Sequence, residues 1–190
     1  MLASKHEVTL TISAAEWATL ILPFADALPE GVTAYSCEDT DGKNLTLEEA
    51  ESIDANTPYL VSGAAGTYTF TGYGMADKDA YTEGLFTGTY VGYQTTAGSN
   101  TYVLQNGAEG VAFYLVGGDA QPMVKAYRCY MTYDAGAGAP VFRIGKGTTS
   151  IDNVQLTNDN VVIYDLMGRK VNTMVKGGMY IVNGKKVVIR

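Results

Sequence analysis

The sequence predicts an all-β protein, an antiparallel β-sandwich followed by a small C-terminal β-hairpin or sheet domain, on three observations. Residues 7–13 alternate polar and apolar side chains, with Val8, Leu10 and Ile12 on one face, as half-buried strands do. The chain has 22 glycines and 14 tyrosines but only 5 prolines, which suits short strands joined by glycine turns. No segment shows sustained helical periodicity.

The later elements are expected where apolar runs are bounded by turn residues. Residues 71–100 are rich in Gly, Tyr, Thr and Ser and poor in aliphatic side chains, so we expect long loops and short edge strands there. Residues 48–53 are a candidate for one helical turn, and residues 106–110 for the loop of a hairpin. The further strands that we expect are residues 17–22, 32–38, 45–47, 59–62, 67–70, 101–105, 111–116, 123–133 and 141–144.

We place a β-sandwich module at residues 1–146 and a small β domain at residues 147–190. Residues 145–150 are rich in Gly, Thr and Ser and lack large apolar side chains, which favours a linker between the two. The core of the sandwich is expected to hold Val8, Leu10, Ile12, Leu20, Leu60, Tyr68, Phe70, Val103, Phe113 and Leu115.

The C-terminal domain is expected to turn at Asn183-Gly184, which lies between the apolar-rich runs 179–182 and 185–189. Asn-Gly is the preferred pair for a two-residue type I′ turn, because both central residues need positive φ. That turn pairs Val182 with Lys185 and Met179 with Val188. Both faces of this hairpin carry apolar side chains, so we expect it to pack with residues 161–166 in a small sheet.

Charge is distributed unevenly along the chain. The net charge is −7, but residues 161–190 carry six basic residues and one acid, a net charge of +5 that leaves −12 for the rest. An acidic body repels phosphate backbones, so we expect no nucleic-acid partner. No apolar run approaches the ~20 residues that span a bilayer, and no signal peptide is visible in the first residues.

The sequence offers little for catalysis or metal binding. His6 is the only histidine, whereas nucleophilic triads and histidine metal sites need a positioned imidazole. Cys37 and Cys129 are the only cysteines and are interpreted as small apolar fillers, with a disulfide as the alternative. The run 39–44, DTDGKN, is interpreted as an Asp-Gly turn and not as a calcium loop, because the distal glutamate of such loops is missing. We therefore expect no enzyme activity, no cofactor and no metal.

Clustered carboxylates are the one remaining basis for acid–base chemistry. A glycosidase would need two of them facing one another in a cleft. Asp77 and Asp79 lie in an expected loop, and the other acids are interpreted as a solvated face. Those others are Glu48, Glu49, Glu51 and Asp54.

Four tyrosines in the loop-rich region are candidates for a ligand-binding surface. They are Tyr73, Tyr81, Tyr90 and Tyr93. Exposed tyrosines stack on sugar rings or anchor protein partners. The alternative for each is packing against an aromatic or aliphatic side chain of a neighbouring strand.

The tail carries two ordered motifs. Residues 164–171, YDLMGRKV, match the pattern Y-D-L-x-G-R-x-V, and residues 178–182, GMYIV, match G-x-Y-I-V before a basic β end. This pair resembles the C-terminal sorting-type, type IX secretion-like domain of Bacteroidetes secreted proteins. The resemblance implies recognition of the tail by secretion machinery and a location outside the cell, secreted or on the outer surface. The residues that carry it are Tyr164, Asp165, Leu166, Gly168, Arg169, Gly178, Tyr180, Asn183 and Gly184.

The body has a resemblance of its own. The order L-P-F at 22–24, G-V-T-A-Y at 31–35, I-x-A-N-T-P-Y-L-V at 53–61 and G-T-Y-T-F at 66–70 is similar to adhesion or anchoring modules of Bacteroidetes surface proteins. The resemblance implies a non-catalytic module for adhesion, anchoring or display, at the C-terminal end of a larger protein, with a glycan or protein partner at the cell surface. The alternative function is a carbohydrate-binding module of a glycan-degrading surface protein.

Overall fold

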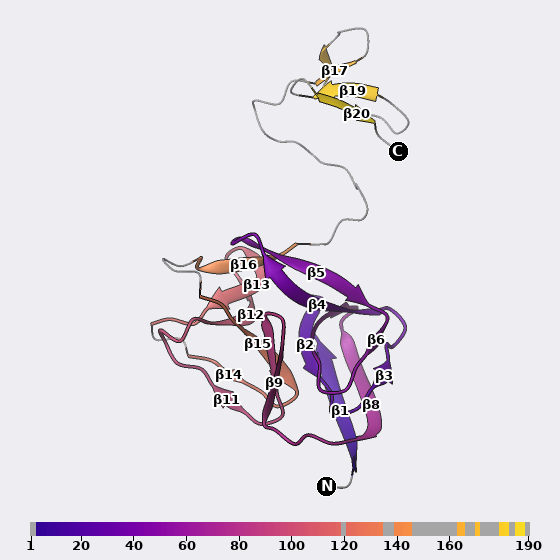
Figure 1. The fold of residues 1–190 in the computed structure, drawn as a ribbon, viewed down its shortest axis with the longest axis vertical. Coiled ribbons are helices and arrows are strands. Elements are labelled where there is room, and N and C mark those ends of the chain that lie inside the picture. Colours follow the sequence, from indigo (N-terminus) through magenta and orange to yellow (C-terminus); the bar gives the residue numbers. More distant parts are fainter. Residues whose placement is uncertain are drawn as a thin grey trace. The chain divides into compact units, whose positions relative to one another are not determined.

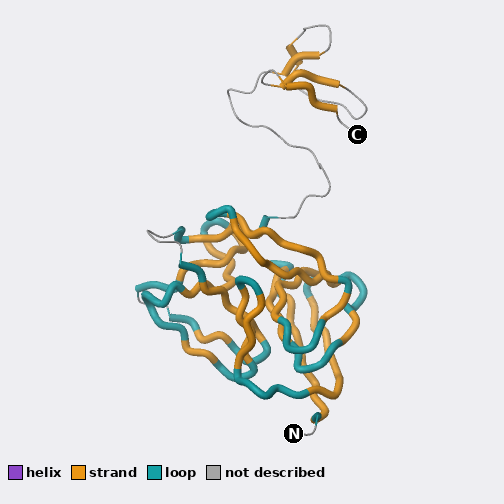
Figure 2. The backbone as a smooth tube through the Cα atoms, viewed as in Figure 1, coloured by secondary structure: helices purple, strands orange, loops and turns teal. Residues whose placement is uncertain are grey.

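The computed structural model describes residues 3–118, 121–134 and 139–145, and the backbone of four strands at 163–165, 170–171, 179–182 and 185–188. The chain divides into two compact units, Met1–Gly147 and Thr148–Arg190 (Figure 1). The described residues form strands, turns and loops but no helix (Figure 2), which confirms the all-β prediction.

The first unit has sixteen strands among its described residues. Most are short, and tight turns join them, as the glycine-rich composition predicts. Their bounds are β1 (Ser4–Ile12), β2 (Trp17–Ile21), β3 (Asp26–Ala27), β4 (Val32–Thr40), β5 (Asn44–Ala50), β6 (Ser52–Ile53), β7 (Pro58–Gly63), β8 (Gly66–Gly74), β9 (Ala80–Glu83), β10 (Phe86–Thr89), β11 (Tyr93–Gln94), β12 (Thr101–Gly107), β13 (Gly110–Leu115), β14 (Met123–Val124), β15 (Arg128–Thr132) and β16 (Val141–Ile144).

Ten of these strands form one sheet in the order β2-β7-β4-β5-β16-β13-β12-β15-β10-β9. All neighbours are antiparallel except β16 and β5, which run parallel. The sheet curls, so that its far end returns to its beginning (Figure 1). The Leu85 N–H donates to the Cys37 carbonyl at 2.8 Å, which joins the β9–β10 turn to β4.

The curled sheet meets itself where β2 lies beside β15, and we call this junction the seam. A side chain makes most of its hydrogen bonds. The buried Thr19 hydroxyl accepts a hydrogen bond from the Cys129 N–H at 2.9 Å and donates one to the Cys129 carbonyl at 3.3 Å. The Ile21 N–H adds a bond to the Tyr127 carbonyl at 3.3 Å. Gly88 on β10 permits the close approach, because a Cβ there would lie 2.6 Å from Ile21 Cδ1. The hydroxyl thus bridges β2 and β15, which form no ladder with each other.

A second layer covers one face of the curled sheet. β1 and β8 pair antiparallel along their whole length, from Ser4 with Gly74 to Ile12 with Gly66. The predicted alternation on β1 is confirmed, since Val8, Leu10 and Ile12 are all buried. The buried residues between these two layers are Val8, Leu10, Ile12, Leu20, Leu22, Phe24, Val32, Ala34, Ile53, Tyr59, Val61 and Phe70.

A separate core fills the inside of the curl. Phe86 and Phe113 stack there with ring centroids 5.3 Å apart, and Tyr102 meets Phe142 edge to face at 4.9 Å. The packing of two layers face to face is consistent with the sandwich prediction. The buried residues inside the curl are Cys37, Leu45, Leu60, Phe86, Tyr102, Phe113, Met131 and Phe142.

The prediction that Leu115 belongs to the core is wrong. Eight of the ten expected residues are buried and Tyr68 is half-buried, but Leu115 is 37% exposed. It has the same strand parity as the buried Phe113, so alternation alone places it inside. It is the last residue of β13 and lies beyond Tyr114, the last residue of that strand to pair with β16. The Leu115 N–H still donates to the Pro140 carbonyl at 3.0 Å, so the backbone stays paired there while the side chain lies at the exposed end of the strand.

Three further expectations are wrong. Residues 123–133 form two strands and not one, because Tyr127 has φ of +61° and breaks the extended backbone between β14 and β15. Residues 48–53 are extended and not helical, because β5 pairs with β4 as far as Ala50, and β6 pairs with β3. Residues 86–89 are not an edge, because β10 is buried between β15 and β9.

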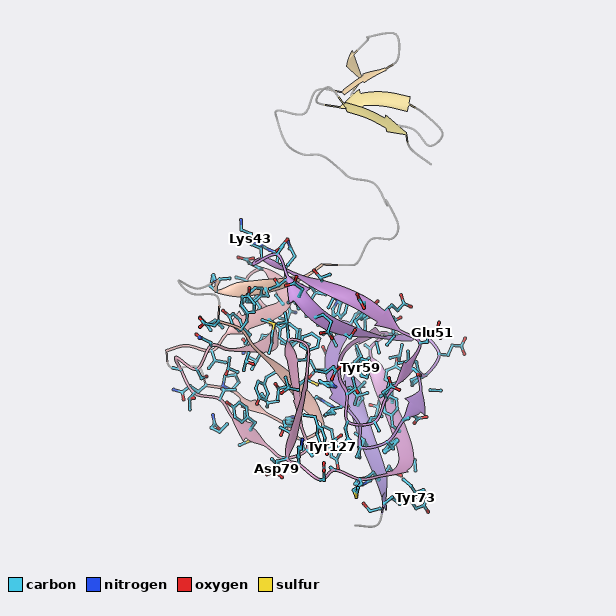
Figure 3. The ribbon with its side chains drawn as sticks, viewed as in Figure 1. Lys43, Glu51, Tyr59, Tyr73, Asp79 and Tyr127 are labelled. Atoms are coloured by element: carbon cyan, nitrogen blue, oxygen red, sulfur yellow. The ribbon has the colours of Figure 1, made fainter. Side chains whose placement is uncertain are left out.

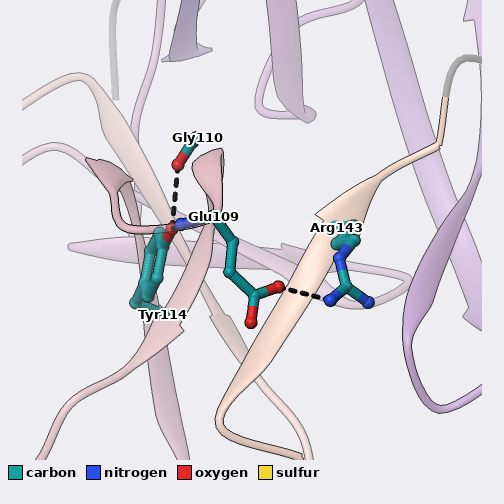
Figure 4. Close-up of polar contacts among 4 residues, drawn as sticks. All are labelled: Glu109, Gly110, Tyr114 and Arg143. Carbon is teal, nitrogen blue, oxygen red and sulfur yellow. Dashed lines mark hydrogen bonds and ion pairs between the residues drawn. The ribbon is translucent and has the colours of Figure 1, made fainter.

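The predicted hairpin of residues 101–116 is confirmed, with a turn tighter than expected. β12 and β13 pair as far as Gly107 with Gly110. The Tyr114 hydroxyl donates to the Gly110 carbonyl at 2.9 Å and accepts from the Glu109 N–H at 3.0 Å (Figure 4). An ion pair joins Glu109 to Arg143 on β16 (Figure 4). These contacts hold the turn against the neighbouring strand.

The second unit contains a four-stranded sheet in the order β18-β17-β19-β20. The strands are β17 (Ile163–Asp165), β18 (Lys170–Val171), β19 (Met179–Val182) and β20 (Lys185–Val188). The register predicted from the Asn-Gly pair is confirmed, with Val182 opposite Lys185 and Met179 opposite Val188. The turn residues themselves, 183 and 184, lie outside the described part of the chain.

Candidate functional site

The described part of the first unit contains a cleft of about 480 Å³ on the inner face of the curled sheet. Strands β2, β7, β4 and β5 form its floor, and the turns that precede β2 and follow β7 form part of its rim. The residues that line it are Glu16, Trp17, Tyr35, Leu47, Glu49, Ser62, Gly63 and Ala64. We call this the Trp17 cleft.

Strand register brings these side chains to one face. Trp17 lies opposite Ser62, and Tyr35 lies opposite Glu49. Side chains alternate between the two faces of a strand, so the neighbours of these residues point into the core beneath the β1–β8 layer. Trp17 and Tyr35 come from strands that flank β7, and their ring centroids lie 5.7 Å apart with planes tilted by 41°. The small Ser62 side chain on β7 leaves room for the rings to meet.

The rim of the Trp17 cleft is acidic. Glu16 and Glu49 are both exposed, and none of the lining residues is basic. Glu16 has φ of +62°, a conformation fixed by two backbone hydrogen bonds. Its N–H donates to the Ser13 carbonyl at 2.9 Å, and its carbonyl accepts from the Gly63 N–H at 3.0 Å. The turn before β2 is thus tied to the end of β7, beside Trp17.

Sequence reasoning missed this cleft. Trp17 is the only tryptophan in the chain, and it opens the apolar run 17–22, which is expected to be a strand with Leu20 in the core. Alternation along 17–22 separates Trp17 from the buried Leu20 and Leu22, which was an available indication. The partnership with Tyr35 depends on the order of strands in the sheet, which the local pattern does not contain.

A second groove also has Trp17 in its lining. It has a volume of about 310 Å³ and combines apolar with basic side chains. Met123 is 61% exposed there. Burial lowers the pKa of Arg128, whose guanidinium donates to the Tyr127 carbonyl at 3.1 Å and the Thr9 carbonyl at 3.4 Å. Arg128 therefore supports the seam and the β1 backbone, which is a structural role.

The four predicted tyrosines do not form one platform. Tyr73 is 72% exposed and stands alone near the end of β8 (Figure 3). Tyr93 stacks on Tyr130 with centroids 4.4 Å apart. Tyr81 and Tyr90 are brought together, but edge to face at 5.7 Å. The structure therefore divides the predicted surface among three places.

Tyr81 and Tyr90 also have structural partners. The Tyr90 hydroxyl donates to Asn56 Oδ1 at 2.8 Å, and burial raises the pKa of Tyr90. The Tyr81 hydroxyl donates to the Asp77 carboxylate, and this bond lowers the pKa of Asp77. These hydrogen bonds tie the β8–β9 loop and β10 to the body. The alternative of packing between neighbouring elements accounts for both residues.

Both thiols are buried and free, as expected of small apolar fillers. Burial raises the pKa of Cys37 to about 11 and that of Cys129 to about 12. A thiol must ionise to act as a nucleophile or to bind most metals. Both side chains instead donate to backbone carbonyls, Cys37 to Asp39 at 3.4 Å and Cys129 to Leu20 at 3.2 Å.

The run 39–44 contains the turn between β4 and β5, at residues 41–43. Asp41 Oδ1 accepts from the Lys43 N–H at 2.8 Å and the Asn44 N–H at 2.6 Å, and Oδ2 accepts from Asn44 Nδ2 at 2.8 Å. The hydrogen bonds from Asn44 lower the pKa of Asp41. Its carboxylate oxygens thus stabilise the turn. Among the described residues, no group of three or more His, Cys, Asp or Glu could hold a metal ion.

The sorting-type residues fall partly within the described strands. Tyr164 and Asp165 lie on β17 and Tyr180 on β19, where Asp165 and Tyr180 are direct cross-strand partners. The ordered motifs thus meet in adjacent strands of one sheet. Leu166, Gly168, Arg169, Gly178, Asn183 and Gly184 lie outside the described residues.

No protein-family model, curated protein or solved structure matches the chain. No helix among the described residues combines the length and apolar character that a membrane span requires.

Proposed function

We propose that the chain is a non-catalytic binding module of a secreted or cell-surface protein, acting in adhesion, anchoring or display. The observation that carries the proposal is the Trp17 cleft, where two aromatic rings and an acidic rim share one open concave surface. Ligand sites commonly combine an apolar floor with a few polar groups that orient the ligand.

The chemistry of the cleft favours binding over catalysis. General-acid catalysis on glycosides depends on a carboxyl group held in an apolar environment, whereas Glu16 and Glu49 are both exposed. The single histidine, His6, hydrogen-bonds Ser4 at 2.8 Å near the start of β1 and does not line the cleft. The cleft residues thus suit recognition better than proton transfer.

The C-terminal sheet supports export as the second part of the proposal. Its motifs resemble those of sorting-type domains, and Tyr164, Asp165 and Tyr180 lie on adjacent strands. The tail also has the opposite charge to the rest of the chain, which gives secretion machinery a distinct surface to recognise. We assign the tail to delivery and the first unit to binding.

Deletion of residues 148–190 in the organism that encodes the protein tests delivery. Surface exposure is measured by antibody labelling of intact cells and by protease accessibility, and total protein by immunoblot of lysed cells. We expect the full chain to be labelled on intact cells and the truncated chain to be detected only after lysis. Equal surface labelling of the two chains at equal abundance would refute the role of the tail.

A carbohydrate-binding module is the second candidate function, and the aromatic pair of the Trp17 cleft is the observation that favours it. As the alternative, it assigns the module to a glycan-degrading surface protein, whereas the first function is adhesion, anchoring or display. The tyrosines of residues 73–93 no longer supply its basis, since three of the four pack against other tyrosines.

A further inference from the structure

We propose that the Trp17 cleft binds a sugar ring of a neutral polysaccharide. This inference rests on the proposed binding function and names the ligand class of the same site. Three features carry it: the joined aromatic surface, the unengaged hydrogen-bonding groups around it, and the size of the cleft.

The aromatic surface suits one face of a sugar ring. Trp17 and Tyr35 are in contact with each other, since centroid distances of about 4.5–7 Å are typical of packed aromatic pairs. They therefore act as one apolar surface, which Leu47 extends on the neighbouring strand β5. Pyranose rings present C–H groups on a face, and those groups pack on aromatic rings.

The rim supplies polar groups for the hydroxyls at the edge of the sugar. Within the described part of the chain, the carboxylates of Glu16 and Glu49 and the Ser62 hydroxyl have no hydrogen bond or ion pair with the protein. Carboxylates accept hydrogen bonds from hydroxyl groups, and a serine hydroxyl both donates and accepts. These three groups are therefore free to bind hydroxyls around the aromatic floor.

The size and openness of the cleft suit a polymer. A volume of about 480 Å³ falls within the range of about 300–1,000 Å³ seen for small-ligand sites. Glu16, Glu49 and Ala64 on the rim are exposed, so the site opens to solvent. A bound ring can thus continue into further sugar units outside the cleft.

A cationic ligand is the main alternative for an acidic aromatic site, and the ring geometry disfavours it. An aromatic cage holds a cation between ring faces, with each centroid within about 6 Å of the charge. Trp17 and Tyr35 already touch one another and leave no space between their faces. Exposed carboxylates also attract cations weakly, because water and salt screen the interaction.

Fluorescence of the single tryptophan tests the proposal on the whole purified chain. The probes are soluble xylan, galactomannan, mixed-linkage β-glucan and soluble starch, each titrated at low and at high NaCl. We expect at least one of them to shift or quench the Trp17 emission in a saturable way. The apparent affinity should be nearly independent of salt, because a neutral ligand makes no ion pair.

Two variants and one matched control assign the response to the cleft. Tyr35→Leu should weaken the apparent affinity about tenfold or more, because it removes half of the aromatic surface. Glu49→Gln should weaken it severalfold while leaving the fold intact. Glu48→Gln changes the adjacent exposed glutamate on the opposite face of β5 and should leave affinity unchanged. Thermal unfolding of each variant confirms that it is folded.

Several outcomes would overturn the inference. These are no response to any of the four polysaccharides, an unchanged affinity in both Tyr35→Leu and Glu49→Gln, or an equal loss in Glu48→Gln. A salt-sensitive response to choline or polylysine without a response to polysaccharide would assign the cleft to cations instead. Surface labelling of the full chain in the absence of any sugar response would refute only the ligand class, and the delivery proposal would stand.

Discussion

Replacement of Phe113 by alanine is the sharpest test of the core inside the curled sheet. Phe113 is fully buried on β13, lies opposite Phe142 of β16 and stacks on Phe86 with centroids 5.3 Å apart. The substitution removes the ring from a site that three strands enclose, so the loss combines transfer of the ring to water with the cavity left behind. Such substitutions cost about 3–5 kcal/mol.

The magnitude is measurable by thermal and urea unfolding, with the fluorescence of Trp17 as the probe of the first unit. For a unit of this size, about 1 kcal/mol lowers the melting temperature by about 2–4 °C, so we expect a decrease of about 6–20 °C. Leu115→Ala is the matched control, because Leu115 lies on the same strand with the same parity but is 37% exposed. It should cost less than about 1 kcal/mol.

Two results would refute this description of the core. A loss below about 1 kcal/mol for Phe113→Ala would mean that the ring does not fill the interior of the curl. A loss at Leu115 as large as that at Phe113 would mean that the end of β13 is covered and that the sheet extends beyond its last paired residue.

Three further predictions concern the seam, the thiols and the tail. Thr19→Val should cost about 1–3 kcal/mol in urea unfolding, because the Cys129 N–H and carbonyl lose a buried partner; a loss near zero would show that the seam is held otherwise. Burial raises the pKa of Cys37 to about 11 and that of Cys129 to about 12. The stability that the two buried, protonated thiols contribute to the fold is therefore complete below pH 9.0 and is lost as the pH rises through the two raised pKa values. Ellman's reagent at about pH 8 should therefore label neither thiol in the folded chain and both in guanidinium chloride, and labelling of the folded chain would contradict their burial. Deletion of residues 148–190 should leave the melting temperature of the first unit nearly unchanged, and failure of the truncated chain to fold would make the tail part of the core.

The local sequence pattern was sufficient to predict the buried face of one strand and the register of one hairpin. The alternation at 7–13 identified the buried face of β1, since side-chain direction has a period of two in any strand. The Asn183-Gly184 pair set the register of β19 and β20, because a two-residue turn leaves only one pairing. Both results depend on neighbours in sequence and not on the rest of the fold.

Long-range packing decided the positions where the pattern failed. Leu115 is exposed at the end of β13, although its N–H still donates to the Pro140 carbonyl, and Tyr127 adopts a positive φ between β14 and β15. Period-two alternation encodes neither the exposed end of a strand nor a positive φ. The glycine-rich run around Phe86 was expected at an edge, but Gly88 is small enough for the sheet to close over it.

The candidate site could not be predicted for a related reason. Tyrosines close together in sequence, such as Tyr81 and Tyr90, pack against each other and so do not form an open binding surface. The aromatic pair that lines a cleft, Trp17 and Tyr35, comes from strands separated by β7 in the sheet. Composition suggested that aromatic side chains would form the site, but only the register of β2, β7 and β4 shows which ones meet.

The most direct test of the central claim uses the indole N–H of Trp17, which gives a single side-chain resonance because the chain has one tryptophan. Oligosaccharides prepared from the four polysaccharides are titrated into the ¹⁵N-labelled chain. If the Trp17 cleft binds sugar, the indole resonance shifts in a saturable way together with the backbone amides of Ser62 and Glu49. If sugar instead moves resonances of residues 73–93 while the indole stays in place, or moves none, the assignment of the cleft as the binding site is contradicted.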